Sequence, residues 1–355
     1  MIRTSDFGPG AKSGEVSVYL SWLDRWDERR VQRGNALKAR SELALDADLA
    51  FPGAEHDVTL ADFCTLAQRA SDDPSFFERP SVPILDVEHV EDRLKFPSDI
   101  QTDIDENNMV WARVTESGRL GQALIVFHHW NAQKHQRHLA NYFSKRGISV
   151  IEMALPYHFE RSRPGSVYAD YMLSANIGRT IQSVRQAVLD GRKLIAWLKN
   201  EGYEEISVLG MSLGSWVAGL VAAHDDNVSK ASLFLTAGSL ADMVWTGRAT
   251  EAIRQSLEPG LDLADLRAAW SPINQETYAR QLARPGLGLQ LVLAKRDTVV
   301  VPDLSHAFIQ RLRASGADPD VLELNCGHYS LALPPHILIA GLRLRGLLKG
   351  RASRH

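Results

Sequence analysis

The stretch EISVLGMSLGSWVAGLVAAH (residues 205–224) passes from an apolar, β-branched run directly into a helix-forming run. Residues 205–211 are predicted to form a buried strand and residues 212–224 a helix. Their junction holds a G-x-S-x-G pattern, Gly210-Met-Ser-Leu-Gly214. At such a junction the pattern is typical of a sharp, strained turn that raises the serine hydroxyl above the sheet edge. Ser212 is therefore a candidate nucleophile, although a tight glycine-lined turn with an ordinary capping serine is the alternative.

Strands and helices alternate on both sides of this stretch, from about residue 91 to residue 350. Near-continuous Val, Ile and Leu runs separated by helices indicate a mostly parallel sheet that is covered on both faces, a doubly wound α/β fold. The first two strands could form a hairpin. The predicted strands are 91–100, 107–116, 123–129, 148–156, 205–211, 231–238, 289–297 and 321–325, and the helices between them are 131–147, 177–200, 212–224, 304–315 and a last one through Leu348.

Two regions depart from this alternation. Residues 1–90 are predicted to be a helical N-terminal extension, with helices near 16–33 and 59–70, the second capped by Thr59. Residues 239–286 hold three helical pieces and no strand, and they follow a strand on the side where active sites form. We expect this insertion to be a cap, and the main domain to span residues 91–350.

A serine hydroxyl needs a base to become a nucleophile. In this type of fold the partners follow in the order Ser, Asp or Glu, His. Asp297 ends the strand at 289–297, and His328 follows the next strand. Both should lie beside Ser212 at the carboxyl edge of the sheet. Asp242, at the start of the insertion, is the rival acid.

The sequence resembles the alpha/beta-hydrolase superfamily of serine hydrolases and, within it, the carboxylesterase-like members. The resemblance covers roughly residues 100–348 and rests on GMSLG, on the D-x-x-x-x-P stretch at 297–302 and on Gly327-His328, in family order. It implies acyl transfer through a Ser-His-Asp triad, with the backbone amides of Leu213 and Trp130 as oxyanion donors. Many relatives carry His-Gly before the second donor. This chain has His128-His129, which places bulky side chains at the mouth of the site.

Further side chains are candidates for the substrate pocket: His129, Tyr157, His158, Arg161 and Trp245. Arg161 could bind a substrate carboxylate, or the Tyr157–Arg161 group could fix a loop. The histidines between 128 and 138 have no carboxylate or cysteine at a ligand spacing, so no metal site is expected.

The composition excludes several classes of protein. The 355 residues carry 40 Lys and Arg against 43 Asp and Glu, a net charge of −3, which argues against a dedicated nucleic-acid binder. No apolar run reaches the roughly 18 residues of a membrane span, and the first residues lack a signal-peptide core. Two distant cysteines, Cys64 and Cys326, favour a reduced, cytoplasmic setting.

These observations predict a hydrolase that cleaves a carboxylic ester or a related acyl bond of a small molecule without a cofactor. A peptidase or acyltransferase with the same triad, or a non-catalytic binding protein with this fold, remain as alternatives. The oligomeric state is left open.

Overall fold

The computed structural model describes residues 13–79 and 86–350, with side chains from Val18 onward. Residues 1–12, 80–85 and 351–355 lie outside the described residues, and so do the corresponding parts of the predicted N-terminal extension.

Nine strands of the described chain form a single sheet in the order β1-β2-β3-β5-β4-β6-β7-β8-β9. The first three are antiparallel, and β3 also pairs antiparallel with β5, so the predicted hairpin is confirmed as β2 and β3. All the other pairings are parallel. The strands are β1 (Glu88–Val90), β2 (Arg93–Pro97), β3 (Met109–Thr115), β4 (Gln122–Phe127), β5 (Ile148–Met153), β6 (Glu205–Met211), β7 (Val228–Phe234), β8 (Gly288–Ala294) and β9 (Asp320–Leu324).

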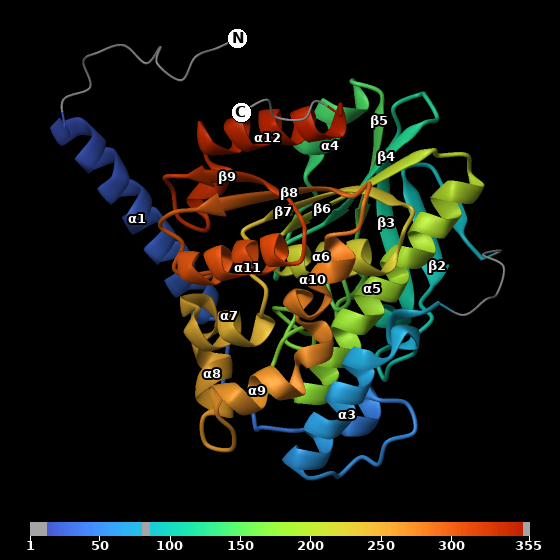
Figure 1. Cartoon of the computed structure of the whole chain (residues 1–355), viewed down its shortest axis with the longest axis vertical. Helices are drawn as coiled ribbons and strands as arrows, with labels where there is room; N and C mark the ends of the chain where they lie inside the picture. Colours follow the sequence, from blue (N-terminus) through green and yellow to red (C-terminus); the bar gives the residue numbers. More distant parts are fainter. Residues whose placement is uncertain (1–12, 80–85, 351–355) are drawn as a thin grey trace.

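Helices cover both faces of this sheet (Figure 1), which confirms the predicted doubly wound, mostly parallel α/β fold. Alternate side chains of one strand enter two separate apolar cores. Leu124 and Val126 of β4 pack in one core, whereas Ile125 and Phe127 pack in the other. The first core lies under α4 (Arg137–Ser144) and α12 (His336–Leu348), and the second under α5 (Ile177–Asn200), α6 (Leu213–His224), α10 (Ala279–Leu282) and α11 (Pro302–Ala314).

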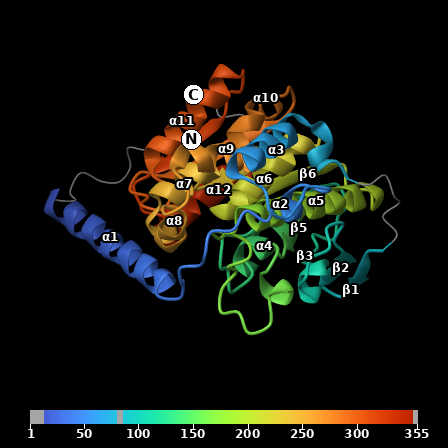
Figure 2. The same cartoon turned by 90° about the horizontal axis from the view of Figure 1, so that it is seen from below.

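The N-terminal region supplies helices that contact different parts of the molecule (Figure 2). α1 (Ser13–Asn35) runs along one side, whereas α2 (Ala47–Ala50) lies against α5 and α3 (Leu60–Asp72) against α9 (Leu263–Ala269). The predicted cap of α3 is confirmed, since the Thr59 side chain accepts a hydrogen bond from the Asp62 amide.

The insertion after β7 contains no strand, as predicted, but more helices than the three expected. They are α7 (Leu240–Thr246), α8 (Glu251–Leu257), α9 and α10, with short 3₁₀ turns between them. The helix predicted over 131–147 is shorter, and α4 begins only at Arg137. Asn131 has a φ of 58°, which an α-helix does not allow, so the segment before α4 is an irregular loop.

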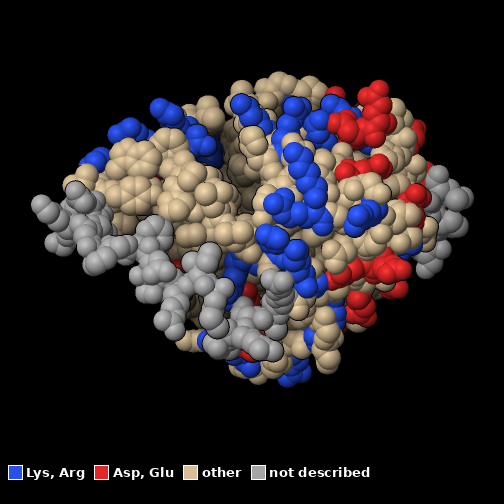
Figure 3. Space-filling view, turned by 90° about the horizontal axis from the view of Figure 1, so that it is seen from above, with Lys and Arg blue, Asp and Glu red and all other residues tan. Residues whose placement is uncertain are grey.

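The charged side chains are unevenly distributed over the surface. Figure 3 views the face that carries α12 and shows Lys and Arg gathered along its middle, with Asp and Glu toward one end. At the opposite end, where α1 lies, a tan surface is bordered along one edge by Lys and Arg.

Candidate active site

Ser212 occupies a strained turn between β6 and α6. Its φ of 52° and ψ of −124° lie outside the regions that side-chain-bearing residues normally adopt. The Ser212 amide donates to the Phe234 carbonyl at 2.9 Å, and its carbonyl accepts from the Ser215 amide at 2.7 Å. These bonds hold the turn, so that the hydroxyl projects at the carboxyl edge of the parallel strands, where α/β folds place their ligands.

The two glycines of the turn are required by close backbone contacts. A Cβ on Gly210 would lie 2.2 Å from the Gly214 carbonyl oxygen, and one on Gly214 would lie 2.2 Å from the Phe127 carbonyl oxygen. Neither position can therefore carry a larger residue without moving β4, β6 or α6 apart.

Asp297 and His328 come from the loops after β8 and β9, and the structure brings both to Ser212. His328 Nδ1 lies 2.8 Å from Asp297 Oδ2, and His328 Nε2 lies 3.0 Å from Ser212 Oγ. The other oxygen of Asp297 accepts hydrogen bonds from the amides of Val299 and Val300 at 2.7 and 2.9 Å. An acceptor at Nδ1 favours the tautomer with its proton on Nδ1, which leaves Nε2 free to take the proton of Ser212.

The rival acid, Asp242, has a different partner. It lies in α7 and forms an ion pair with Arg267, whose Nε is 3.0 Å from Asp242 Oδ2. Of the two carboxylates considered from the sequence, only Asp297 is hydrogen-bonded to His328.

The loop after β4 carries the second expected oxyanion donor, Trp130. The His128 ring donates from Nδ1 to the His129 carbonyl at 2.9 Å and accepts from the Leu155 amide at 3.1 Å. The Trp130 indole donates to the Ala169 carbonyl at 2.8 Å. Asn131, two residues after His129, adopts a left-handed conformation, which this residue type tolerates.

Tyr157, His158 and Arg161, expected to line the pocket or to fix a loop, are buried. The guanidinium of Arg161 has no exposed surface and binds Asp190 at 2.8 Å, and also the carbonyls of Asn107 and Ala154. His158 donates to the Pro156 carbonyl and accepts from the Asn131 amide at 2.9 Å. These contacts favour the loop-fixing interpretation over a pocket role for Arg161, because no part of its side chain is left to meet a substrate.

His129 and Trp245 are placed differently. His129 lies near His328 and Arg30, and burial, together with these two neighbours, lowers the pKa of His129 to about 4. Its imidazole is therefore neutral at physiological pH. Trp245 is half-buried in α7 and packs against the larger apolar core.

Two side chains of the N-terminal region lie beside the residues of this site and were not predicted from the sequence. Asp27 of α1 accepts hydrogen bonds from the Tyr329 and Ser330 amides, next to His328. Lys38 follows α1, and its ammonium lies 4.4 Å from the centre of the Trp130 ring. Burial lowers the pKa of Lys38 to about 8. The signal for Asp27 was present, since a carboxylate interrupts the apolar stripe formed by Leu23 and Val31.

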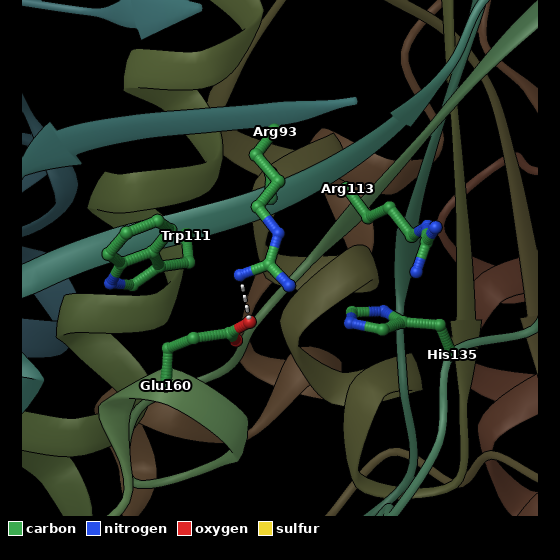
Figure 4. Close-up of a pocket in the computed structure, with 6 residues that line it drawn as sticks. Arg93, Trp111, Arg113, His135 and Glu160 are labelled. Atoms are coloured by element: carbon green, nitrogen blue, oxygen red, sulfur yellow. Dashed lines mark hydrogen bonds and ion pairs between the residues drawn. The ribbon is translucent and has the colours of Figure 1, made fainter. Parts of the chain in front are cut away.

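A separate shallow pocket lies at the antiparallel edge of the sheet (Figure 4). Arg93, Trp111, Arg113, His135 and Glu160 line it, and Arg93 binds Glu160 at 3.0 Å. None of the side chains around Ser212 contributes to this pocket.

Within the described residues, no group of three or more His, Cys, Asp or Glu side chains is arranged to hold a metal ion. Likewise, no helix in residues 13–79 and 86–350 is both long enough and apolar enough to cross a membrane.

The topology and the serine turn define the alpha/beta-hydrolase fold, and solved structures support this assignment. Acetyl xylan esterase 1 from Thermoanaerobacterium sp. matches with a TM-score of 0.58 and 15% identity, over 90% of this chain and 98% of the esterase. The acylaminoacyl peptidase of Pyrococcus horikoshii has a TM-score of 0.57 and 11% identity, over 76% of this chain and 42% of the peptidase. A puromycin-hydrolyzing peptidase of Mycobacterium tuberculosis has a TM-score of 0.52 and 17% identity, over 70% of this chain and 38% of the peptidase.

Sequence comparison gives a shorter match. No protein-family model matches the chain. An uncharacterized protein of Mycobacterium tuberculosis (strain H37Rv) is 26% identical over 140 residues, which are 38% of this chain. The matched part spans only 30% of that relative's length.

Proposed function

We propose that this protein is a serine hydrolase that cleaves a carboxylic ester, or a closely related acyl bond, of a small molecule. The observation that carries the proposal is the continuous hydrogen-bonded series Asp297–His328–Ser212, which ends on a strained, partly exposed serine. The same series recurs in unrelated enzymes that transfer acyl groups, because it gives a neutral base access to a hydroxyl proton.

The proposed reaction follows from these positions. His328 Nε2 takes the proton as Ser212 Oγ bonds to the carbonyl carbon, and Asp297 stabilises the imidazolium that forms. The amides of Leu213 and Trp130 then donate to the oxyanion. Collapse expels the alcohol, which receives the proton from His328. Water, deprotonated by His328, next releases the acid and restores Ser212. None of these steps requires a cofactor.

A peptidase or acyltransferase reaction is the second candidate. Acylaminoacyl and puromycin-hydrolyzing peptidases share the fold, although this chain matches less than half of either. The esterase match covers nearly the whole of both chains, and this supports the ester as first choice.

A labelling experiment with a substrate panel tests the proposal. A fluorophosphonate should label the wild-type protein at Ser212 and should not label Ser212→Ala. On p-nitrophenyl esters of increasing acyl length, Ser212→Ala should lose on the order of 10⁶ in kcat. Near-wild-type turnover by this variant, or a folded wild-type protein that is neither labelled nor active, would refute the proposal. Ester formation from an added alcohol would indicate an acyltransferase instead.

We also propose that the insertion at 239–286 is a cap that contributes to acyl-chain selection. Trp245, only half-buried, is the side chain chosen to test it. Trp245→Ala should change the ratio of kcat/KM between short and long esters by about 1–3 kcal/mol of discrimination. A constant ratio with a lower Tm would make Trp245 a packing residue only.

A further inference from the structure

α1 contacts the loop after β8, the insertion after β7 and, through Asp27, the loop that carries His328. Asp24 pairs with Arg296 in the loop after β8, with the Arg296 Nε 2.8 Å from Asp24 Oδ1. Glu28 pairs with Arg248 of the insertion, also at 2.8 Å. Figures 1 and 2 show α1 lying along the outside of the α/β body, so these contacts come from a helix at the periphery.

The inward face of α1 presents a carboxylate between two apolar residues. Leu23, Asp27 and Val31 are spaced four residues apart, so they lie on one side of the helix. Leu23 is fully buried in the same core as Cys326, and Val31 packs with Val299. Asp27 between them is only 6% exposed. A charge buried in such a position is costly unless it is paired or hydrogen-bonded.

The hydrogen bonds that Asp27 makes surround His328. Its Oδ1 accepts from the Tyr329 amide at 2.6 Å and from the Ser330 amide at 3.1 Å. On the other side of His328, a Cβ on Gly327 would lie 2.5 Å from the Asp27 carboxyl carbon. Gly327 therefore leaves the space that the carboxylate occupies, and the backbone before and after His328 rests against one side chain of α1.

We propose that Asp27 is a positioning residue, which holds the backbone of the His328 loop so that the imidazole reaches both Asp297 and Ser212. This inference rests on the function proposed above. Asp297 orients the ring by a bond to Nδ1, and Asp27 fixes the main chain that carries the ring. Two carboxylates from opposite ends of the sequence thus locate one histidine.

Cys326 is consistent with this arrangement. It is fully buried in the same loop. Burial and the negative charges of Asp27 and Asp297 raise the pKa of the Cys326 thiol to about 12. Both carboxylates therefore lie close to the Cys326 thiol.

The alternative is that Asp27 only attaches α1 to the body. Glu28 provides the matched control, because it is the next residue of the same helix and its ion pair with Arg248 does not touch the His328 loop. If attachment were the whole role, Glu28→Gln would resemble Asp27→Asn, because each removes the charge of the carboxylate and keeps an oxygen acceptor.

The test compares Asp27→Ala, Asp27→Asn, Gly327→Ala and Glu28→Gln in the full-length protein. For Asp27→Ala we expect kcat to fall by about 10²-fold, since a small displacement of a reacting group has this effect. KM should change by less than about twofold, because no substrate contact is removed. Gly327→Ala should act similarly by displacing Asp27, and Asp27→Asn, which keeps an oxygen acceptor, should lose less. Glu28→Gln should stay within about twofold of wild type in kcat.

A second readout separates this proposal from the proposed function. The Nδ1 proton of His328 that is shared with Asp297 can be followed by downfield proton NMR, without any substrate. Its resonance should shift or broaden in Asp27→Ala and Gly327→Ala and remain in Glu28→Gln. If the wild-type protein proves inactive, the NMR comparison still decides the role of Asp27. An unchanged resonance and kcat in Asp27→Ala, or equal losses in Glu28→Gln, would overturn it. If Asp27→Ala fails to fold, Asp27→Asn and Gly327→Ala decide by the same criteria.

Discussion

Two buried polar clusters of this molecule both pair a carboxylate with a basic side chain. They differ in whether one of their polar atoms is exposed. One joins Ser212, His328 and Asp297, and the other joins Arg161, Asp190 and the Asn107 carbonyl. In the second cluster each of the three guanidinium nitrogens donates to an acceptor, and Asp190 Oδ1 also accepts from the Ser98 hydroxyl at 2.7 Å. In the first, the terminal oxygen lies on a strained residue that is only partly buried.

The difference shows that burial and altered acidity do not by themselves mark a reactive site. Burial raises the pKa of Asp190, opposed by the positive charge of Arg161. A search for shifted ionisable groups would therefore select this pair. What distinguishes the serine cluster is its place at the carboxyl ends of β6, β8 and β9 and the partial exposure of Ser212.

The largest effect expected within the comparison concerns the acid of the serine cluster. Asp297→Asn should lower kcat by about 10⁴-fold, because an amide favours the wrong tautomer of His328. Asp242→Asn should change kcat little, since Asp242 binds Arg267. Steady-state kinetics on one p-nitrophenyl ester distinguish the two, and the reverse result would transfer the role of acid to the insertion.

The second cluster should respond in stability rather than in turnover. Arg161→Leu leaves Asp190 buried without its partner, so the free energy of unfolding should fall by about 3–5 kcal/mol. Urea unfolding measures this loss. Replacing both residues by apolar ones should recover much of it, because neither charge then remains buried. A folded Arg161→Leu protein of normal stability whose KM rises steeply would instead favour the pocket interpretation.

Prediction from sequence succeeded where the deciding signal was local or ordered along the chain. The strand-to-helix junction located Ser212, and chain order was enough to place Asp297 and His328 at the same sheet edge. Prediction from sequence was insufficient where a side chain binds a partner that is distant in the sequence. Nothing near Arg161 indicates that its carboxylate partner lies in α5, and nothing near His328 points to Asp27, about 300 residues earlier.

Backbone conformation was the other feature that the sequence did not predict. His129 stands where many members of the resembled superfamily carry glycine, and the left-handed φ in this loop belongs to Asn131. Its side-chain oxygen then accepts from the Ala169 amide at 2.8 Å, a contact that only the folded chain creates.

The smallest expected effect is a pH dependence that originates beside the serine cluster. Burial lowers the pKa of His158 to about 4, from an ordinary value of 6.5. Between these values the unfolded chain binds a proton that the folded chain does not, so stability falls as the pH drops from about 6.5 to 4. One such histidine contributes a slope of up to about 1.4 kcal/mol per pH unit. Protonation at Nε2 would also break the bond from the Asn131 amide, next to Trp130. Urea unfolding between about pH 4.5 and 7 gives the slope of the free energy of unfolding against pH. In His158→Gln this slope should correspond to nearly one proton fewer than in the wild type. The exposed His138→Gln is the control, and its slope should match the wild type. Equal slopes in all three proteins would mean that His158 is not held neutral by the fold.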